Sequence, residues 1–313
     1  MSLLNLPSHT LLVVAFILLL LVFASVVVYQ KQQKRPEKDY AELVMRTKSW
    51  WWMIGLVVLA LAFGRVTTIL FLMVLSLLAL REFYAIVPLR EVDRKLALWT
   101  YVAVPVQYGL VYMDWYGMFI VFIPVYMFLF LPLRSVLIGE TKGVIKSNAV
   151  IQWGLMLCVF AFSHIAFLTN LAPAQHEKAG YAGLVLLLLF LTQFNDVAQY
   201  VSGKTFGKHK IIPKVSPNKT WEGFIGGVCA TSLLACVIAP FLSTLTHAQG
   251  LFAGLLIAGA GFVGDVVISS VKRDLEIKDS GTLIPGHGGL LDRIDSLIYT
   301  APLFFHFLYY LKC

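Results

Sequence analysis

The chain alternates long apolar runs with short polar segments. Five runs have close to the roughly 20 residues that an α-helix needs to cross a bilayer; they are residues 10–29, 149–171, 181–201, 251–270 and 294–311. Five shorter or interrupted runs are residues 51–63, 66–80, 96–113, 116–133 and 223–245. The pattern predicts an all-α, polytopic integral membrane protein with about ten transmembrane helices. Nine is the alternative, because the runs beside Gly64 and Arg65 are separated least clearly.

Composition and basic residues refine this prediction. Hydrophobic residues make up 59% of the 313-residue chain and charged residues only 13%, whereas soluble domains carry about 25% charged residues. If the first helix starts outside, five segments share one side and hold 22 of the 25 Lys and Arg residues: 30–50, 81–95, 134–148, 202–220 and 271–293. Cytoplasmic loops carry this excess, so we expect those segments in the cytoplasm and both termini on the opposite side, in the inner membrane if the source is bacterial.

The same reasoning divides the chain into three regions. Residues 1–50 are predicted to be a membrane anchor with a basic linker, residues 51–175 an N-terminal transmembrane region, and residues 176–313 a catalytic transmembrane region. The first apolar run is not a typical secretory signal, because its basic cluster follows the run instead of preceding it. The net charge of +8 reflects topology and an anionic cytoplasmic partner, without a nucleic-acid signature.

Two carboxylates lie inside apolar runs of the catalytic region. Asp196 and Asp265 are each five residues from the predicted cytoplasmic end of their helix, which corresponds to about 7.5 Å. Helical spacing places Ser269 and Lys272 on the same face as Asp265. Because the two carboxylates lie at one depth, we expect that they can share a metal ion.

Residues 269–296 mix cations, carboxylates and glycines around a Pro-Gly-His-Gly-Gly turn. A phosphate and a divalent metal together require such groups. His287 is suited to donate to phosphate, and Gly288 and Gly289 to form an anion-binding nest. For Asp292 and Asp295, simple capping of the last helix remains an alternative.

The segment 202–222 carries five lysines and leads into Gly223, Gly226 and Gly227. Small residues at a helix start admit close approach of another helix or of a phosphate, and the spacing does not decide between them. A basic loop beside anionic lipid is a further alternative.

These segments resemble the phosphatidate cytidylyltransferase (CDP-diacylglycerol synthase) family. The family signature is matched by Ser269-x-x-Lys272-Arg273, Lys278-Asp279, Gly281, Pro285, His287-Gly288-Gly289 and Asp292-Arg293-x-Asp295. The stretches 203–208 and 216–223 are similar to its second block. The matching region covers residues 192–298, about a third of the chain.

The resemblance implies a membrane-embedded CTP:phosphatidate cytidylyltransferase that makes CDP-diacylglycerol and pyrophosphate for phospholipid biosynthesis. It implies a polar active-site cavity facing the cytoplasm, CTP and phosphatidate or a similar lipid phosphate as partners within the bilayer, and Mg²⁺ as cofactor, with a second cation and a homodimer left open. The implied catalytic residues are Asp196, Lys219, Asp265, Lys272, Arg273, His287, Asp292 and Arg293. The implied substrate-binding residues are Ser216, Lys219, Thr220, Glu222, Ser269, Lys278, Asp279, Gly288, Gly289 and Asp295, and the metal ligands are Asp196, Asp265 and Asp292.

Other functions remain open at this point. A CTP-dependent lipid kinase would use a related polar layer but would need a base for a neutral hydroxyl, and a cytidylyltransferase could act on another lipid phosphate. A lipid transporter or flippase would place polar residues near mid-membrane and on both sides, whereas this chain confines its cluster to one side.

Overall fold

The computed structural model describes residues 6–34, 39–139, 142–171 and 178–311, and every regular element in that part of the chain is a helix. Its elements are α1 (Ser8–Lys34), α2 (Ala41–Ala62), α3 (Arg65–Ile86), α4 (Glu91–Tyr112), α5 (Tyr116–Val121), the π-helical η1 (Phe122–Met127), α6 (Phe128–Ile138), α7 (Val144–Leu155), the π-helical η2 (Met156–Ala161), α8 (Phe162–Leu171), α9 (Gly180–Phe206), α10 (Trp221–Leu242), α11 (His247–Asp274) and α12 (Leu291–Leu311). The segments α5–η1–α6 and α7–η2–α8 are continuous, so each predicted apolar run corresponds to one helical rod.

Seven of the described rods are long and apolar enough to cross a membrane: α1, α3, α5–α6, α7–α8, α9, α10 and α11. The prediction of an all-helical, polytopic integral membrane protein is therefore confirmed. Helices α2, α4 and α12 have similar lengths of 22, 22 and 21 residues, but each carries charged residues in its first two turns.

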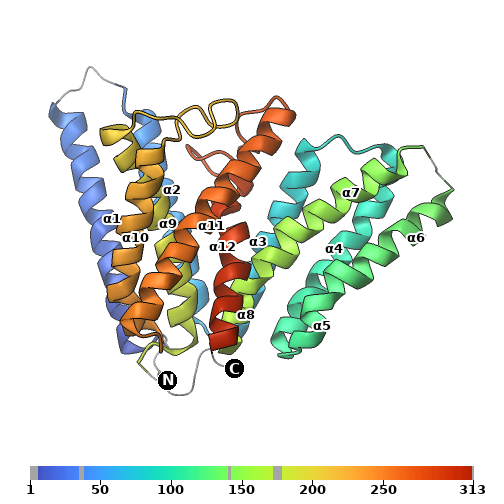
Figure 1. Ribbon diagram of the computed structural model, residues 1–313, viewed down its shortest axis with the longest axis horizontal. Helices are drawn as coiled ribbons and strands as arrows, with labels where there is room; N and C mark the ends of the chain where they lie inside the picture. Colours follow the sequence, from blue (N-terminus) through green and yellow to red (C-terminus); the bar gives the residue numbers. More distant parts are fainter. Residues whose placement is uncertain (1–5, 35–38, 140–141, 172–177, 312–313) are drawn as a thin grey trace.

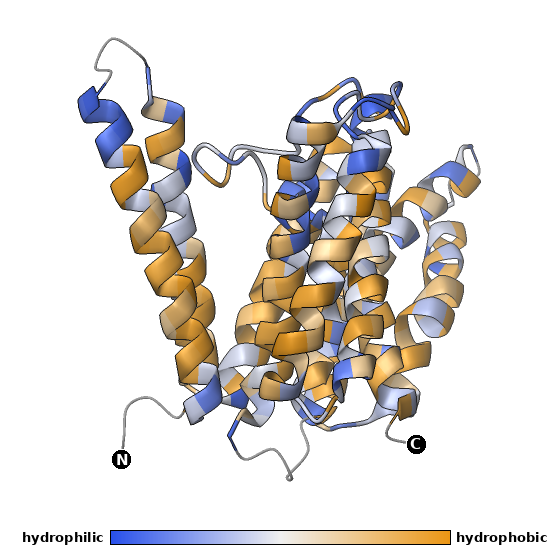
Figure 2. Cartoon of the chain, turned by 60° about the vertical axis from the view of Figure 1, so that its left-hand side comes forward, coloured by the Kyte–Doolittle hydropathy of each residue, from blue (hydrophilic) through white to orange (hydrophobic). Residues whose placement is uncertain are grey.

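The helix ends sort to two sides of the molecule. In Figure 1 the start of α1 and the end of α12 lie at the bottom, whereas the helix ends that flank the α1–α2, α3–α4, α6–α7, α9–α10 and α11–α12 connections lie at the top. These are the five connections predicted to share one side, although residues 35–38 and 140–141 lie outside the described residues. Figure 2 shows hydrophilic residues in these connections and in the upper part of the central helices. We call this side the polar end.

Several helices extend beyond the apolar runs toward the polar end. Helix α2 begins at Ala41, so residues 41–50, which were assigned to a basic linker, form its first turns. Helix α9 continues to Phe206 although its apolar run ends at residue 201. Hydropathy marks where the bilayer ends, but Glu, Lys and Arg are good helix formers and let a helix continue into the aqueous layer.

Small residues bring α9, α10, α11 and α12 close together. A Cβ atom added at Gly254 of α11 would lie 2.6 Å from the Ser232 Cα of α10, and one added at Gly264 would lie 3.1 Å from the Ser296 Cα of α12. Such contacts are typical of helix pairs that pack through glycine in membranes. The approach at Gly264 places the second turn of α12 against the segment of α11 that carries Asp265.

Candidate active site

Lys219 joins the α9–α10 loop to α9 and α11. Its Nζ lies 2.5 Å from Asp265 Oδ2 of α11 and 3.4 Å from Gln199 Oε1 of α9. The other carboxylate oxygen of Asp265 accepts a hydrogen bond of 3.2 Å from Ser269 Oγ, one helical turn away. The α9–α10 loop therefore folds back onto both helices, and a lysine neutralises the carboxylate that it meets.

Asp196 lies beside this pair. Both of its carboxylate oxygens are 3.2 Å from Ser296 Oγ of α12, and it is close enough to Lys219 and Asp265 for their charges to interact. Asp295 interacts electrostatically with Asp196 and Asp265 as well. Three carboxylates, from α9, α11 and α12, thus gather at the polar end.

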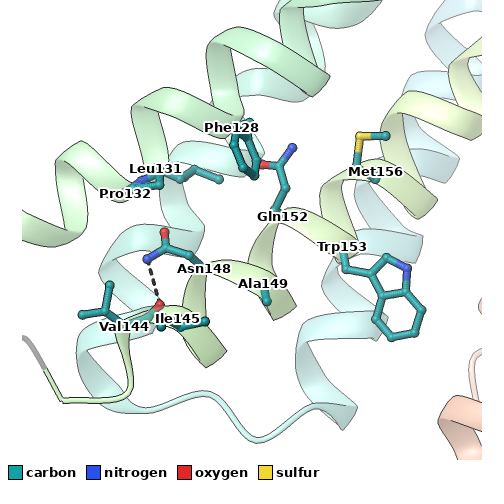
Figure 3. Close-up of a pocket in the computed structure, with 10 residues that line it drawn as sticks. All are labelled: Phe128, Leu131, Pro132, Val144, Ile145, Asn148, Ala149, Gln152, Trp153 and Met156. Atoms are coloured by element: carbon teal, nitrogen blue, oxygen red, sulfur yellow. Dashed lines mark hydrogen bonds between the residues drawn. The ribbon is translucent and has the colours of Figure 1, made fainter.

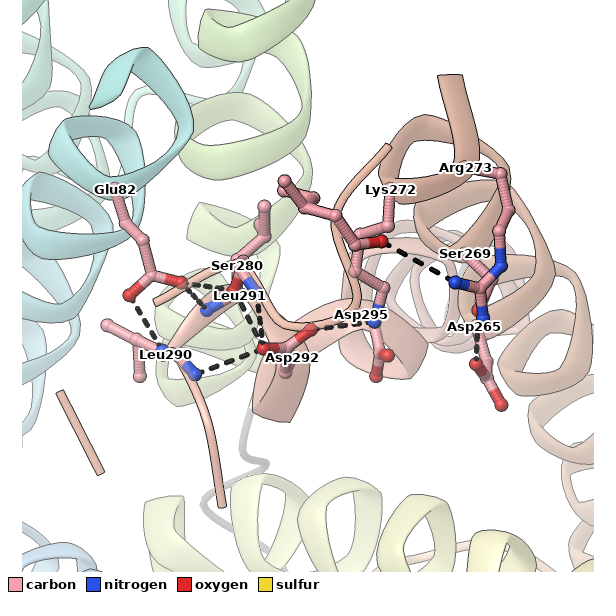
Figure 4. A network of polar contacts seen from close by, with 12 residues as sticks. Glu82, Asp265, Ser269, Lys272, Arg273, Ser280, Leu290, Leu291, Asp292 and Asp295 are labelled. Carbon is pink, nitrogen blue, oxygen red and sulfur yellow. Dashed lines mark hydrogen bonds and ion pairs between the residues drawn. The ribbon is translucent and has the colours of Figure 1, made fainter. Parts of the chain in front are cut away.

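Asp292 belongs to a neighbouring network, shown in Figure 4. Lys272 Nζ donates to its Oδ1 at 2.7 Å, and its Oδ2 accepts from the Ser280 and Gly289 amides at 2.8 and 3.0 Å. The carboxylate beside Asp196 and Asp265 is therefore Asp295, and the metal role expected of Asp292 stays a prediction.

Glu82 of α3 completes that network, and sequence reasoning missed it. Its carboxylate accepts from the Leu290 and Leu291 amides at 2.8 and 2.9 Å, and the Ser280 hydroxyl lies 2.5 Å from it. The Gly289 amide, which was expected to belong to an anion nest, is instead donated to Asp292, and the nest role of Gly288 stays a prediction. One sequence signal existed, since a helix that begins Leu290-Leu291 has no capping side chain at its start.

His287 sits on a tight turn held by α2. Ile284 and Gly288 pair across the turn, Ser49 Oγ donates to the Pro285 carbonyl at 2.6 Å, and the edge of the Trp50 ring packs on His287. The imidazole is 8% exposed. This burial, together with the charge of Arg293, lowers the pKa of His287, so the ring is neutral at pH 7.

Arg293 reaches both parts of the cluster. Its charge acts on Asp196 and on His287, and its Nε is buried with no hydrogen-bond partner among the described residues. The Nδ1 of His287 is in the same situation. Buried donors are normally paired, so Arg293 Nε marks a part of the cluster that is suited to an anion.

Arg273 has a different position from the other cations. Its Nε donates to the Val215 carbonyl at 3.2 Å, which ties the α9–α10 loop to the end of α11, and Nη1 is 3.5 Å from the Ile277 carbonyl. The phosphate-binding role expected of Arg273 stays a prediction.

The remaining predicted substrate-binding residues have local contacts or face solvent. Thr220 Oγ1 caps α10 by accepting from the Gly223 amide at 3.2 Å, and Glu222 accepts from the Lys208 and His209 amides. Ser216 is half-buried, and Lys278 and Asp279 are exposed. Their contacts with substrate stay predictions.

The glycines at the start of α10 serve helix packing. A Cβ at Gly223 would lie 2.9 Å from the Gln199 carbonyl, and one at Gly226 would lie 2.5 Å from Ser202 Oγ. Of the two alternatives left open by the spacing, the structure places another helix, α9, against these residues. The same close packing buries Gln199, which is 5% exposed. Its side-chain oxygen accepts a hydrogen bond from Lys219, a contact that was not predicted from the sequence.

The donor set can be tested against a magnesium ion. No three His, Cys, Asp or Glu groups within the described residues are placed to hold a metal ion by themselves. Mg²⁺ usually needs fewer, because it binds one or two carboxylates and completes an octahedron with water and substrate phosphates. Asp196 and Asp265 supply such oxygen ligands next to cations that can hold the phosphates, so the residues fit the ion.

A cavity of about 600 Å³ lies elsewhere, between α6 and α7 (Figure 3). Its walls are mainly apolar, with Phe128, Leu131 and Trp153 among them. Asn148 is one of its few polar side chains, and its amide donates to the Val144 carbonyl of its own helix at 2.9 Å. Since no predicted site residue and no charged residue lines this cavity, it is unsuited to a phosphate.

The fold and the cluster define a polytopic membrane protein whose carboxylates and cationic side chains meet at one end of the helices. The model of the cytidylyltransferase family matches residues 44–311, and the chain belongs to that family. It is therefore a nucleotidyltransferase, as the resemblance implied.

Individual relatives agree with this assignment. The chain is 43% identical over 275 residues to the uncharacterized protein YnbB of Escherichia coli, covering 88% of this chain and 90% of that protein. It is 37% identical over 194 residues to the phosphatidate cytidylyltransferase of Haemophilus influenzae, covering 52% of this chain and 67% of that enzyme. With the phosphatidate cytidylyltransferase of Mycobacterium leprae it shares 41% identity over 135 residues, which is 43% of each chain.

Proposed function

We propose that this enzyme is a CTP:phosphatidate cytidylyltransferase that makes CDP-diacylglycerol and pyrophosphate for phospholipid biosynthesis, with its active site on the cytoplasmic side. The observation that carries the proposal is the contact of Lys219 with Asp265, because it joins one block that resembles the family to α11, the helix on which the other block begins. Relatives named for this activity add support.

The reaction places few demands on acid–base chemistry. A phosphate oxygen of the lipid forms a bond to the α-phosphorus of CTP, and the bond from that phosphorus to the oxygen bridging to the β-phosphate breaks, releasing pyrophosphate. The nucleophile is already an anion, so no general base is required. The main obstacle is repulsion between two polyanions, and positioned cations lower it.

The cations of the cluster suit this task. Lys219, Lys272 and Arg293 come from three different elements and lie beside the carboxylates at the polar end. We assign them to the phosphate groups of CTP and of the lipid. The hydroxyls of Ser269 and Ser296 fix the orientation of Asp265 and Asp196.

Asp196 and Asp265 would hold Mg²⁺, with Asp295 beside them. When bound, the ion would neutralise phosphate charge and favour departure of pyrophosphate. Both carboxylates lie on membrane helices fixed by neighbouring helices, which keeps their separation constant while substrates enter from water and from the lipid leaflet.

The proposal is tested with purified full-length protein in lipid nanodiscs supplied with CTP, Mg²⁺ and phosphatidate. We expect equal amounts of pyrophosphate and CDP-diacylglycerol, and loss of both in Asp265→Asn. The control is Lys214→Ala, which changes an exposed lysine of the α9–α10 loop. This variant should keep wild-type activity. Release of CDP without pyrophosphate would identify a kinase instead, and a panel of other lipid phosphates tests the substrate.

A further inference from the structure

The start of α12 is capped by a distant helix. A leucine precedes Leu291, the first residue of α12, and leucine cannot accept the hydrogen bonds of exposed amides at a helix start. Glu82 of α3 supplies the acceptors, since Oε2 accepts from the Leu290 amide and Oε1 from the Leu291 amide (Figure 4). A carboxylate at this end of a helix also interacts favourably with the helix dipole.

A serine connects this cap to the rest of the network. The Ser280 hydroxyl lies 2.5 Å from Glu82 Oε1 and 2.9 Å from Asp292 Oδ2, so its single proton is shared between two carboxylates. The backbone of the segment that precedes α12 is thereby held from the side of α3 and from the side of α12.

The space that Glu82 occupies is reserved for it. A Cβ atom at Gly289 would lie 2.6 Å from Glu82 Cδ and even closer to Glu82 Oε1 and to Ser280 Oγ. An alanine at position 289 would therefore force the Glu82 carboxylate and the Ser280 hydroxyl out of their positions. This contact explains the second glycine of the His-Gly-Gly sequence without any ligand.

The first two turns of α12 carry most of what the candidate site uses from this helix. Asp292 holds Lys272, Arg293 acts on Asp196, and Ser296 binds Asp196. Any shift or fraying at the start of α12 would move all of these groups together. The anchor that sets the position of this start relative to α3 is Glu82.

We propose that Glu82 is a positioning residue of the active site, which acts on the reaction through the first two turns of α12. The proposal rests on the proposed function for its kinetic consequence, but its structural consequence can be measured without substrate. Glu82 needs no contact with CTP or lipid in this role.

The kinetic test compares Glu82→Gln with Glu91→Gln, an exposed carboxylate at the start of α4. A glutamine side chain has the same shape, but its amino group cannot accept a hydrogen bond. We expect kcat to fall about 10-fold to 100-fold, as for other residues that orient ligating groups, with a much smaller change in KM for CTP, and no change for Glu91→Gln. Unchanged kcat, or a lower unfolding temperature with unchanged kcat of the folded protein, would overturn the proposal.

The substrate-free test is hydrogen exchange of the peptide that contains Leu290 and Leu291. In Glu82→Gln these amides should exchange faster than in wild type, because one acceptor is lost; unchanged exchange would overturn the proposal. If wild-type protein released no pyrophosphate from CTP, the proposed function would fail, while this measurement would still decide the role of Glu82.

A double variant tests the contact with Gly289. Gly289→Ala alone should inactivate the enzyme, since the new methyl group meets the carboxylate. Combined with Glu82→Ala it should add little further loss, because the carboxylate that lies closest to the new methyl group is gone. Losses that simply multiply in the double variant would show that the two residues act independently and would overturn the proposal.

Discussion

Lys219 and Asp265 form an ion pair with 2.5 Å between Nζ and Oδ2. Their side chains are 19% and 27% exposed, so the pair is accessible to a ligand from the polar end of the molecule. The Lys219 side chain can therefore turn from the Asp265 carboxylate to a phosphate group of a substrate that binds at the polar end.

Replacing Lys219 by methionine should reduce turnover severely. Methionine keeps the apolar stem of the side chain but removes the positive charge. That charge compensates the negative charges of Asp265 and Asp196, and we assign it to bind a substrate phosphate. We expect kcat/KM to fall on the order of 10²-fold to 10³-fold, as when one preorganised donor to a transition state is removed. Steady-state rates of pyrophosphate release give the answer. Lys214→Met in the same loop should retain wild-type rates; equal rates in both variants would contradict the role of Lys219.

Apolar length and motif spacing predicted much of this arrangement. The ten apolar runs correspond to ten helical rods of the described residues, because the thickness of the bilayer dictates such runs. The spacing of Asp265, Ser269 and Lys272 placed them correctly along one helix. Helix ends were predicted too short, since charged residues prolong a helix beyond the apolar layer.

Contacts between distant parts of the chain could not be predicted. The hydrogen bond from the Leu291 amide to Glu82 spans 209 positions of sequence. Nothing in the sequence around Arg81 and Glu82 distinguishes Glu82 from a charged residue that anchors a helix at the membrane interface. Ser49 holds the Pro285 carbonyl across 236 positions. Such pairs depend on how helices pack, and one sequence contains no record of that packing.

The close approach of α11 and α12 predicts different results for two glycines of one helix. A Cβ at Gly264 would lie 3.1 Å from Ser296 Cα, whereas one at Gly259 meets nothing within 4 Å. Gly264→Ala should push α12 away and weaken the bond between Ser296 and Asp196, at a cost of about 1–3 kcal/mol for overpacking. Gly259→Ala should be neutral or stabilising by up to about 1 kcal/mol, because alanine favours helix.

Thermal unfolding of the two variants in detergent, followed by their turnover numbers, tests this difference. A lower unfolding temperature and lower activity are expected for Gly264→Ala only. Equal behaviour of the two variants would mean that the helices can separate at no cost and that the position of α12 is not set at Gly264.

Ser49→Ala should loosen the turn that carries His287. The lost hydrogen bond to the Pro285 carbonyl has a net value of about 1 kcal/mol, and Ser49 is 6% exposed, so water cannot easily replace it. We expect faster hydrogen exchange in residues 284–288 and reduced kcat. Thr47→Ala is the matched control, because the Thr47 hydroxyl donates to the Leu43 carbonyl of its own helix. The prediction is wrong if both variants exchange and react like wild type.

The neutral state of His287 makes stability depend on pH in a defined direction. Burial lowers the pKa of this imidazole in the folded protein, whereas an unfolded histidine titrates near 6.5. Between the lowered value and about 6.5 the unfolded state binds more protons, so the free energy of unfolding falls as pH falls through that window and is unaffected by this residue at higher pH. Unfolding temperatures of wild type and His287→Gln should therefore diverge least below about pH 6 and most above about pH 7 if His287 stabilises the turn. A constant difference between the two proteins across this range would show that His287 does not change its proton affinity on folding.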